Sequence, residues 1–155
     1  MRLLVKISVF FAFVVIVLGA FTRLTEAGLG CPDWPGCYGF LGVPSQAEHI
    51  QEAELRFPDA PVEQGKAWNE MVHRYFAGTL GLLILAIAII AWIKGRRYSH
   101  YPTPVKLPTL LLGLVIFQAA LGMWTVTMNL QPLIVMGHLL GGFSVISLLY
   151  LLSLR

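Results

Sequence analysis

The sequence has few charged side chains, and most of its length has none. Asp, Glu, Lys and Arg make up 12% of the 155 residues, and hydrophobic residues make up 57%. Typical globular domains are about a quarter charged. All eight acidic residues fall between Glu26 and Glu70, and residues 107–154 contain no charged side chain. This composition excludes an ordinary soluble domain, and nothing in it suggests a nucleic-acid partner.

Four long apolar segments predict an all-α integral membrane protein with a bundle of four transmembrane helices. One crossing needs about 20 apolar residues, so the uncharged C-terminal stretch must cross twice, turning at Asn129-Leu-Gln-Pro132. We expect a single membrane domain over residues 1–155, with a short helix near residues 45–55 in a long loop that buries no core of its own. The predicted spans are about residues 3–22, 69–93, 107–127 and 132–154, with the loop over about residues 23–68.

The basic residues predict the orientation in the membrane. Seven of the eleven lie near the start of the first span, between the second and third spans, or at the end of the chain, in segments that contain no acid: Arg2, Lys6, Lys94, Arg96, Arg97, Lys106 and Arg155. By the positive-inside rule, both termini are cytoplasmic and the long acidic loop is outside. In a bacterial inner (plasma) membrane that loop is periplasmic. The first span also resembles a signal peptide, but Gly19-Ala-Phe21 is a poor cleavage site, so we expect the span to be retained.

Both cysteines lie in the long loop. Cys31-Pro-Asp-Trp-Pro-Gly-Cys37 is a short, proline-bent segment in a compartment that permits disulfides, which favours a disulfide bond. Two thiols are too few for a structural zinc site. The spacing also differs from the Cys-x-x-Cys-His signature of covalent haem attachment.

A weak internal repeat relates the two predicted helix hairpins. The first span ends Leu18-Gly-Ala-Phe-Thr22, and the third contains Leu121-Gly-Met-Trp-Thr125. The second span opens Met71-Val-His73, and the fourth contains Met136-Gly-His138. Such short matches are common by chance, but their shared order and depth favour a duplicated hairpin.

Two of the four histidines fall inside predicted spans. His73 and His138 lie near the outer ends of spans that run in the same direction, so they can face one another across a bundle. Ionisable residues inside a membrane are costly and usually mark function. His49 and His100 lie in loops, where we expect them to be solvated.

Small residues follow each intramembrane histidine on the same helix face: Ala77, Gly81, Gly141 and Gly142. They leave room for a planar macrocycle, and neutral imidazole is an axial ligand of haem iron. The sequence therefore favours a haem bound by His73 and His138. The alternative is that the glycines serve close helix packing and the histidines hydrogen-bond across helices.

Charged residues surround His73 at the outer end of its span. Glu70 precedes His73 by three residues and Arg74 by four, so its carboxylate can approach either side chain. Arg74 and Arg23 lie at the outer interface, where they could pair with haem propionates. The alternative is an interfacial ion pair between Glu70 and Arg74 that takes no part in chemistry.

Three motifs together resemble the haem A synthase family, over nearly the whole chain: Glu70-x-x-His73-Arg74, the segment from Thr22 through Cys31 to Cys37, and Gln118-x-x-Leu121-Gly122-x-x-Thr125-Val126 leading to His138. The resemblance implies an oxidoreductase that converts a methyl group of haem O to a formyl group, giving haem A for terminal oxidases. It implies that His73 and His138 ligate haem iron, that Glu70 is the catalytic acid, and that Cys31 and Cys37 are the outer-loop pair.

The chain departs from the family in length. Family members mostly have eight spans in two similar halves, each with a histidine pair, and this chain matches the first half, which is associated with substrate haem. A haem b is then expected in the second half or in a partner subunit. We interpret the chain as an N-terminal half or a half-size form that pairs with itself. The long cysteine-bearing loop favours the first interpretation. The implied partners are haem O, the lipid bilayer, a second four-helix half or a second copy, and haem O synthase.

Two other classes of protein fit the same features. A bis-histidine b-type membrane cytochrome would transfer electrons without modifying its haem. A non-haem membrane scaffold or transporter half would account for the hairpin repeat and the glycine-rich spans. Identifying a bound pigment separates all three.

Overall fold

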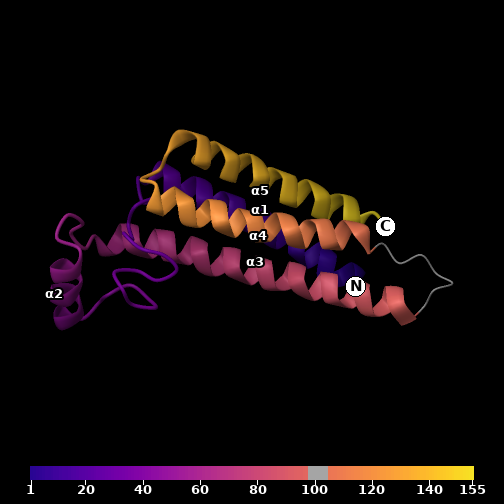
Figure 1. Cartoon of the computed structure of the whole chain (residues 1–155), viewed down its shortest axis with the longest axis horizontal. Coiled ribbons are helices and arrows are strands. Elements are labelled where there is room, and N and C mark those ends of the chain that lie inside the picture. The colour runs from indigo at the N-terminus through magenta and orange to yellow at the C-terminus, as the bar shows by residue number, and fades with distance from the viewer. Residues whose placement is uncertain (98–104) are drawn as a thin grey trace.

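The computed structural model describes residues 1–97 and 105–155, and this part of the chain contains five helices. They are α1 (Arg2–Leu24), α2 (Ala47–Arg56), α3 (Gln64–Arg97), α4 (Lys106–Thr127) and α5 (Pro132–Ser153). The four long helices form an elongated bundle, and α2 lies beyond one end of it (Figure 1). Both termini lie at the opposite end of the bundle.

The four predicted spans are confirmed as helices that are long and apolar enough to cross a membrane. The largest difference is at α3, which begins at Gln64 rather than near Asn69. Its added first turns are polar and carry Ala67, which packs into the outer loop. The helix therefore starts within the loop region and continues into the apolar bundle.

The four long helices are arranged as a square, in which the first helix, α1, also packs against the last, α5. α1 packs against α3 and α5, and α4 packs against the same two helices, while within the described residues the backbones of α3 and α5 do not come close to one another. α3 and α5 are therefore diagonal partners, and Figure 1 shows that they run in the same direction. This arrangement can bring side chains of equal depth on α3 and α5 toward one another across the bundle.

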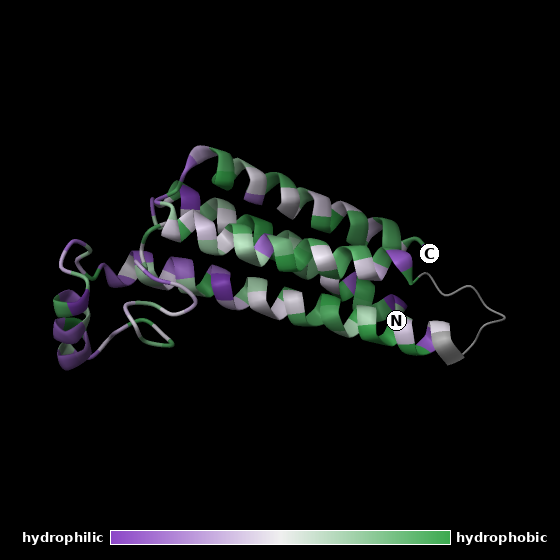
Figure 2. Ribbon diagram, viewed as in Figure 1, coloured by the Kyte–Doolittle hydropathy of each residue, from purple (hydrophilic) through white to green (hydrophobic). Residues whose placement is uncertain are grey.

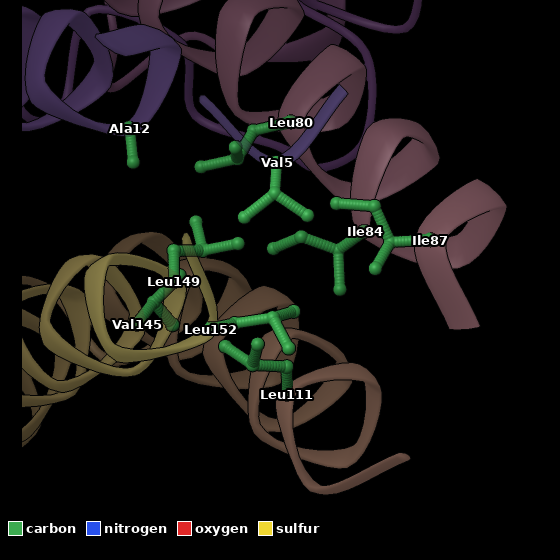
Figure 3. Close-up of a cluster of buried hydrophobic side chains, with 9 residues drawn as sticks. All are labelled: Val5, Ala12, Leu80, Ile84, Ile87, Leu111, Val145, Leu149 and Leu152. Carbon is green, nitrogen blue, oxygen red and sulfur yellow. The ribbon is translucent and has the colours of Figure 1, made fainter. Parts of the chain in front are cut away.

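The bundle core occupies the half nearer the termini. Figure 3 shows apolar side chains from all four long helices meeting there, including Val5, Ile84, Leu111 and Leu149. Many large apolar side chains instead point outward, as Phe10 does at 70% exposed. Figure 2 shows the long helices as mainly hydrophobic, whereas α2 is mainly hydrophilic. An apolar outer surface of this kind suits a lipid environment.

The outer loop folds into a compact unit against the start of α3. Its Cys31 and Cys37 form the expected disulfide, with their Cα atoms 4.8 Å apart. Around the disulfide is a small buried cluster: Cys31, Cys37, Tyr38, Val43, Ala53, Ala67 and Met71. We expected this region to bury no core of its own, and the core that it does bury is shared with α3, because Ala67 and Met71 belong to that helix.

α1 ends in a Schellman turn. The Ala27 N–H donates to the Thr22 carbonyl at 2.9 Å, and the Glu26 N–H donates to the Arg23 carbonyl at 3.3 Å. Glu26 takes the left-handed conformation that this cap requires, with φ of 53°.

α4 also ends in a Schellman turn. The Leu130 N–H donates to the Thr125 carbonyl at 2.8 Å, and the Asn129 N–H donates to the Val126 carbonyl at 3.1 Å. Asn129 has φ of 50°. Since Thr22 and Thr125 are the last residues of the two Leu-Gly-x-aromatic-Thr motifs, the sequence repeat corresponds to a structural repeat. The hairpins α1–α3 and α4–α5 are thus two versions of one unit.

Candidate functional site

The structure places His73 on α3 and His138 on α5, the two diagonal helices of the bundle. Each is half-buried, and each has a buried Nδ1 atom without a hydrogen-bond partner within residues 1–97 and 105–155. Polar atoms buried in a protein are nearly always hydrogen-bonded. The two imidazoles, with unsatisfied buried nitrogens in one bundle interior, are therefore candidates to bind a ligand.

Each histidine ring lies against a glycine of the neighbouring helix. A Cβ added at Gly19 of α1 would lie 3.0 Å from Cε1 of His73, and one at Gly122 of α4 would lie 3.4 Å from Cε1 of His138. Both glycines belong to the repeated Leu-Gly-x-aromatic-Thr motif. The sequence reasoning identified this motif but not its role, which is to make room for the imidazole of the next helix in the hairpin.

The small residues that follow each histidine do not all form the open strip that we expected. The space above Gly141 is filled by the side-chain amide of Gln118, which a Cβ at Gly141 would overlap. Gly142 faces Ile16 at 4.0 Å, whereas no described atom lies within 4 Å of a Cβ built at Gly81. Open space is thus present on α3 and largely filled on α5.

Gln118 is a third interior residue with an unpaired polar atom. It is 7% exposed, and its Nε2 has no partner among the described residues. From the sequence alone, Gln118 stood out only as part of a motif. Its amide is the one polar side chain between Leu110 and Trp124, and this was the signal that could have identified it.

Glu70 is buried and joins α3 to the disulfide loop. Its Oε2 accepts a hydrogen bond from the Cys31 N–H at 2.9 Å, and its Oε1 pairs with the Arg74 guanidinium. The residue is 4% exposed. Of the two approaches predicted for Glu70, the structure shows the one toward Arg74.

Arg74 also binds the disulfide loop, through the guanidinium nitrogen that does not pair with Glu70. Its Nη1 donates to the carbonyl of Asp33 at 3.0 Å and also to the carbonyls of Pro35 and Gly36. Glu70 and Arg74 thus fasten the disulfide loop over the outer end of the bundle, next to His73. Most of the donors of Arg74 are engaged by the loop, so binding of a propionate would require Arg74 to share or exchange these contacts.

The remaining predicted residues lie outside this interior cluster. Arg23 is exposed in the last turn of α1. His49 lies in α2 beside the Phe40 ring, with ring centroids 4.9 Å apart, and is partly exposed. His100 lies outside the described residues.

The residues of this cluster fit a haem. Neutral imidazole nitrogens are iron ligands, His73 and His138 each have an unpaired one, and the surrounding bundle is apolar as a macrocycle requires. Among the described residues, no group of three or more His, Cys, Asp or Glu side chains lies close enough together to hold a separate metal ion. The fold and site define a class: a four-helix bundle with membrane-compatible helices and a shared pair of interior histidines.

Comparison with known proteins identifies the family within this class. The COX15-CtaA family, described as cytochrome oxidase assembly protein, matches residues 2–155. The chain therefore belongs to this family. It is 55% identical over 152 residues to the heme A synthase of Shewanella oneidensis, 30% identical over 142 residues to that of Agrobacterium fabrum, and 32% identical over 134 residues to that of Shouchella clausii.

The alignments cover most of this chain but less than half of each relative. They include 98%, 84% and 86% of this chain, but 44%, 38% and 37% of the three relatives in the same order. The chain thus spans under half the length of these proteins. No solved structure matches the chain significantly.

Proposed function

We propose that this chain is the haem-substrate half of a haem A synthase. The observation that carries the proposal is the pair His73 and His138, with unpaired Nδ1 atoms inside a bundle of this family. Three relatives that bear the name heme A synthase support the choice of reaction. The substrate is haem O, and the product is haem A, in which one ring methyl has become a formyl group.

The haem iron supplies the oxygen chemistry, and the chain binds and positions the macrocycle. His73 and His138 hold the iron from α3 and α5, while Gly19 and Gly122 leave each imidazole room to turn toward it. The apolar helices exclude water from the reacting methyl group. The disulfide loop, fastened by Glu70 and Arg74, covers the outer end of the site.

The orientation and the partners are part of the proposal. Basic residues at the end of the bundle with the termini support an orientation in which that end is cytoplasmic in a bacterial inner membrane and the disulfide loop is periplasmic. A second four-helix half, or a second copy of this chain, supplies a haem b. Haem O synthase is the proposed source of substrate. Reporter fusions at Ser45 should read as periplasmic, and a cytoplasmic reading would overturn this orientation.

A chimera tests the function directly. The aligned segment of the Shewanella oneidensis relative is replaced with this chain, and the chimera is expressed in cells that make haem O but lack their own haem A synthase. Extraction and identification of the pigments should show haem A. His73→Ala and His138→Ala should abolish it, whereas His49→Ala, a histidine outside the bundle, should leave it unchanged. The relative's second half should bring one haem B in either case, so a second haem B per chimera, with no haem A formed, would instead support a b-type cytochrome.

The catalytic role predicted for Glu70 needs its own test. The carboxylate is engaged by Cys31 and Arg74, so a catalytic role requires one oxygen to be released toward the substrate. Glu70→Gln keeps the size and one acceptor oxygen while removing the charge. General acid–base help is worth about 10²–10⁴-fold in rate. If Glu70 is catalytic, haem O accumulates while protein and haem content stay near normal. If it only fastens the loop, haem A falls in proportion to folded protein.

A further inference from the structure

Gln118 carries a buried amide that the fold does not satisfy. The residue is 7% exposed, and its Nε2 donates to no group in residues 1–97 or 105–155. Burying an amide without a partner costs free energy. Packing alone therefore does not explain why the bundle contains this amide.

The amide lies beside His138. It sits over Gly141, where any Cβ would overlap it, and Gly141 follows His138 by three residues on the same face of α5. The backbone carbonyl of Gln118 is next to the His138 ring. Gln118 therefore adjoins the proposed haem site, about one helical turn farther from the outer loop than His138.

The other hairpin shows that packing does not require a polar residue here. Gln118 precedes Gly122 by four residues, and the residue that precedes Gly19 by four is Val15. The carbonyl of Val15 lies next to the His73 ring, just as the carbonyl of Gln118 lies next to the His138 ring. The backbone geometry repeats while the side chain changes from apolar to polar. The amide is thus an addition to a unit that packs without it.

We propose that Gln118 is a third binding residue of the site, and that its Nε2 donates a hydrogen bond to a neutral oxygen on the rim of the bound macrocycle. The inference rests on the proposed function. A charged propionate is excluded as the acceptor, because it would lie deep in the apolar bundle without a cation. Two neutral acceptors remain: the hydroxyl group that haem O and haem A both carry, and the formyl group of haem A.

The test measures binding rather than turnover. The purified, ligand-free chain is titrated with haem O, haem A and haem B, the last of which has neither neutral oxygen. Gln118→Leu should bind haem A about tenfold more weakly and haem B as the unmodified chain does. If the formyl group is the acceptor, haem O affinity stays unchanged and the C=O stretching frequency of bound haem A rises. If the hydroxyl group is the acceptor, haem O and haem A both weaken and the frequency stays constant.

Stability separates binding from a structural role. Without ligand, the Gln118→Leu variant should unfold at the same or a higher temperature than the unmodified chain, because the substitution removes an unpaired amide. If Gln118 had only a structural role, the substitution would instead lower the unfolding temperature. Gln131→Leu, at an exposed position before α5, is the control for the substitution itself. Gly141→Ala displaces the Gln118 amide and should therefore produce the same binding defect. Gly137→Ala, one turn earlier, adds a methyl group that meets only Leu121, at 3.9 Å, and should leave binding unchanged.

Equal affinities of Gln118→Leu and the unmodified chain for all three haems would overturn this inference alone. Failure of the unmodified chain to bind any haem would overturn the proposed function, and the inference with it.

Discussion

The two helix hairpins of this protein share the same helix cap and glycine–histidine contact, and they differ in the segments and polar side chains added to these. α1–α3 and α4–α5 both begin with a helix that ends in a Schellman turn and contains a glycine that receives the histidine of the next helix. Between α4 and α5 the turn is only a few residues long. Between α1 and α3 it is expanded into α2 and the disulfide loop, which Glu70 and Arg74 fasten to α3.

The difference indicates how one unit acquires two tasks. In the first hairpin the added polar groups, Glu70 and Arg74, lie at the end of the bundle and hold the disulfide loop over the site, and we call this loop the cover. In the second, the residues at the positions of Glu70 and Arg74, relative to the histidine, are Val135 and Leu139. Its added polar group, Gln118, lies inside the bundle instead. Four predictions test this division, from the largest expected effect to the smallest.

Removing the carboxylate that fastens the cover should have the largest effect on stability. Glu70→Ala leaves the Arg74 guanidinium and the Cys31 N–H buried without their partner, and breaking a buried ion pair costs about 3–5 kcal/mol. Thermal unfolding in detergent measures the change. Glu52→Ala is the matched control, because Glu52 and Arg56 form an ion pair of the same residue types and spacing on exposed α2. That pair is worth about 0–1 kcal/mol, and similar losses in the two variants would contradict the assigned role of Glu70.

Loss of the disulfide should lower stability less than loss of the Glu70 carboxylate, and its effect should be confined to one hairpin. A native disulfide contributes about 2–4 kcal/mol, and this one closes a short loop, which places it toward the lower value. With both Cys31 and Cys37 changed to Ser, hydrogen exchange should speed up in the outer loop and the first turns of α3. Exchange in α4 and α5 should stay as in the unmodified protein. Faster exchange across both hairpins would show that the cover also stabilises the second hairpin.

The two glycines that receive the histidines should differ in their tolerance of alanine. A methyl group at Gly19 meets the His73 ring at 3.0 Å, whereas one at Gly122 meets the His138 ring at 3.4 Å. Overpacking costs about 1–3 kcal/mol, and alanine favours a helix interior over glycine by about 0.5–1 kcal/mol. Gly19→Ala should therefore lower the free energy of unfolding by about 1 kcal/mol, and Gly122→Ala should leave it nearly unchanged. The reverse order would mean that His73 moves more easily than His138.

The helix caps should give the smallest effects. Glu26 holds a left-handed conformation that costs about 1–2 kcal/mol for most residues, so Glu26→Gly should stabilise the protein by up to about 1 kcal/mol. Asn129 tolerates this conformation better, so Asn129→Gly should change stability less. Comparing the two unfolding midpoints measures the difference. A larger gain at Asn129 would contradict the equivalence of the two caps.

Much of the fold was predictable because the bilayer constrains composition so strongly. Four long apolar segments, two of them within the uncharged residues 107–154, predicted four spans, and each span is a helix. The repeat was predicted from short motifs and is confirmed by the caps after Leu24 and Thr127. The disulfide also formed as expected, because Cys31 and Cys37 are close in sequence.

The site was predictable only in part. His73 and His138 stood out because an ionisable residue is rare inside a span. The sequence did not indicate that Glu70 accepts a hydrogen bond from Cys31, or that the loop buries a core with Ala67. Both contacts join segments far apart in the chain, and a loop has no periodic pattern from which to predict them.

The sequence by itself therefore determined that the chain forms long apolar helices, where they turn, and which residue types lie within them. The tertiary structure alone decided which helix faces meet: His73 against Gly19, His138 against Gly122, and Gln118 over Gly141. The physical reason is that these helices are apolar on nearly every side, so hydrophobic periodicity does not mark the face that turns inward. In such a bundle, close fits between small and large side chains select the packing, and those fits exist only once the helices are assembled.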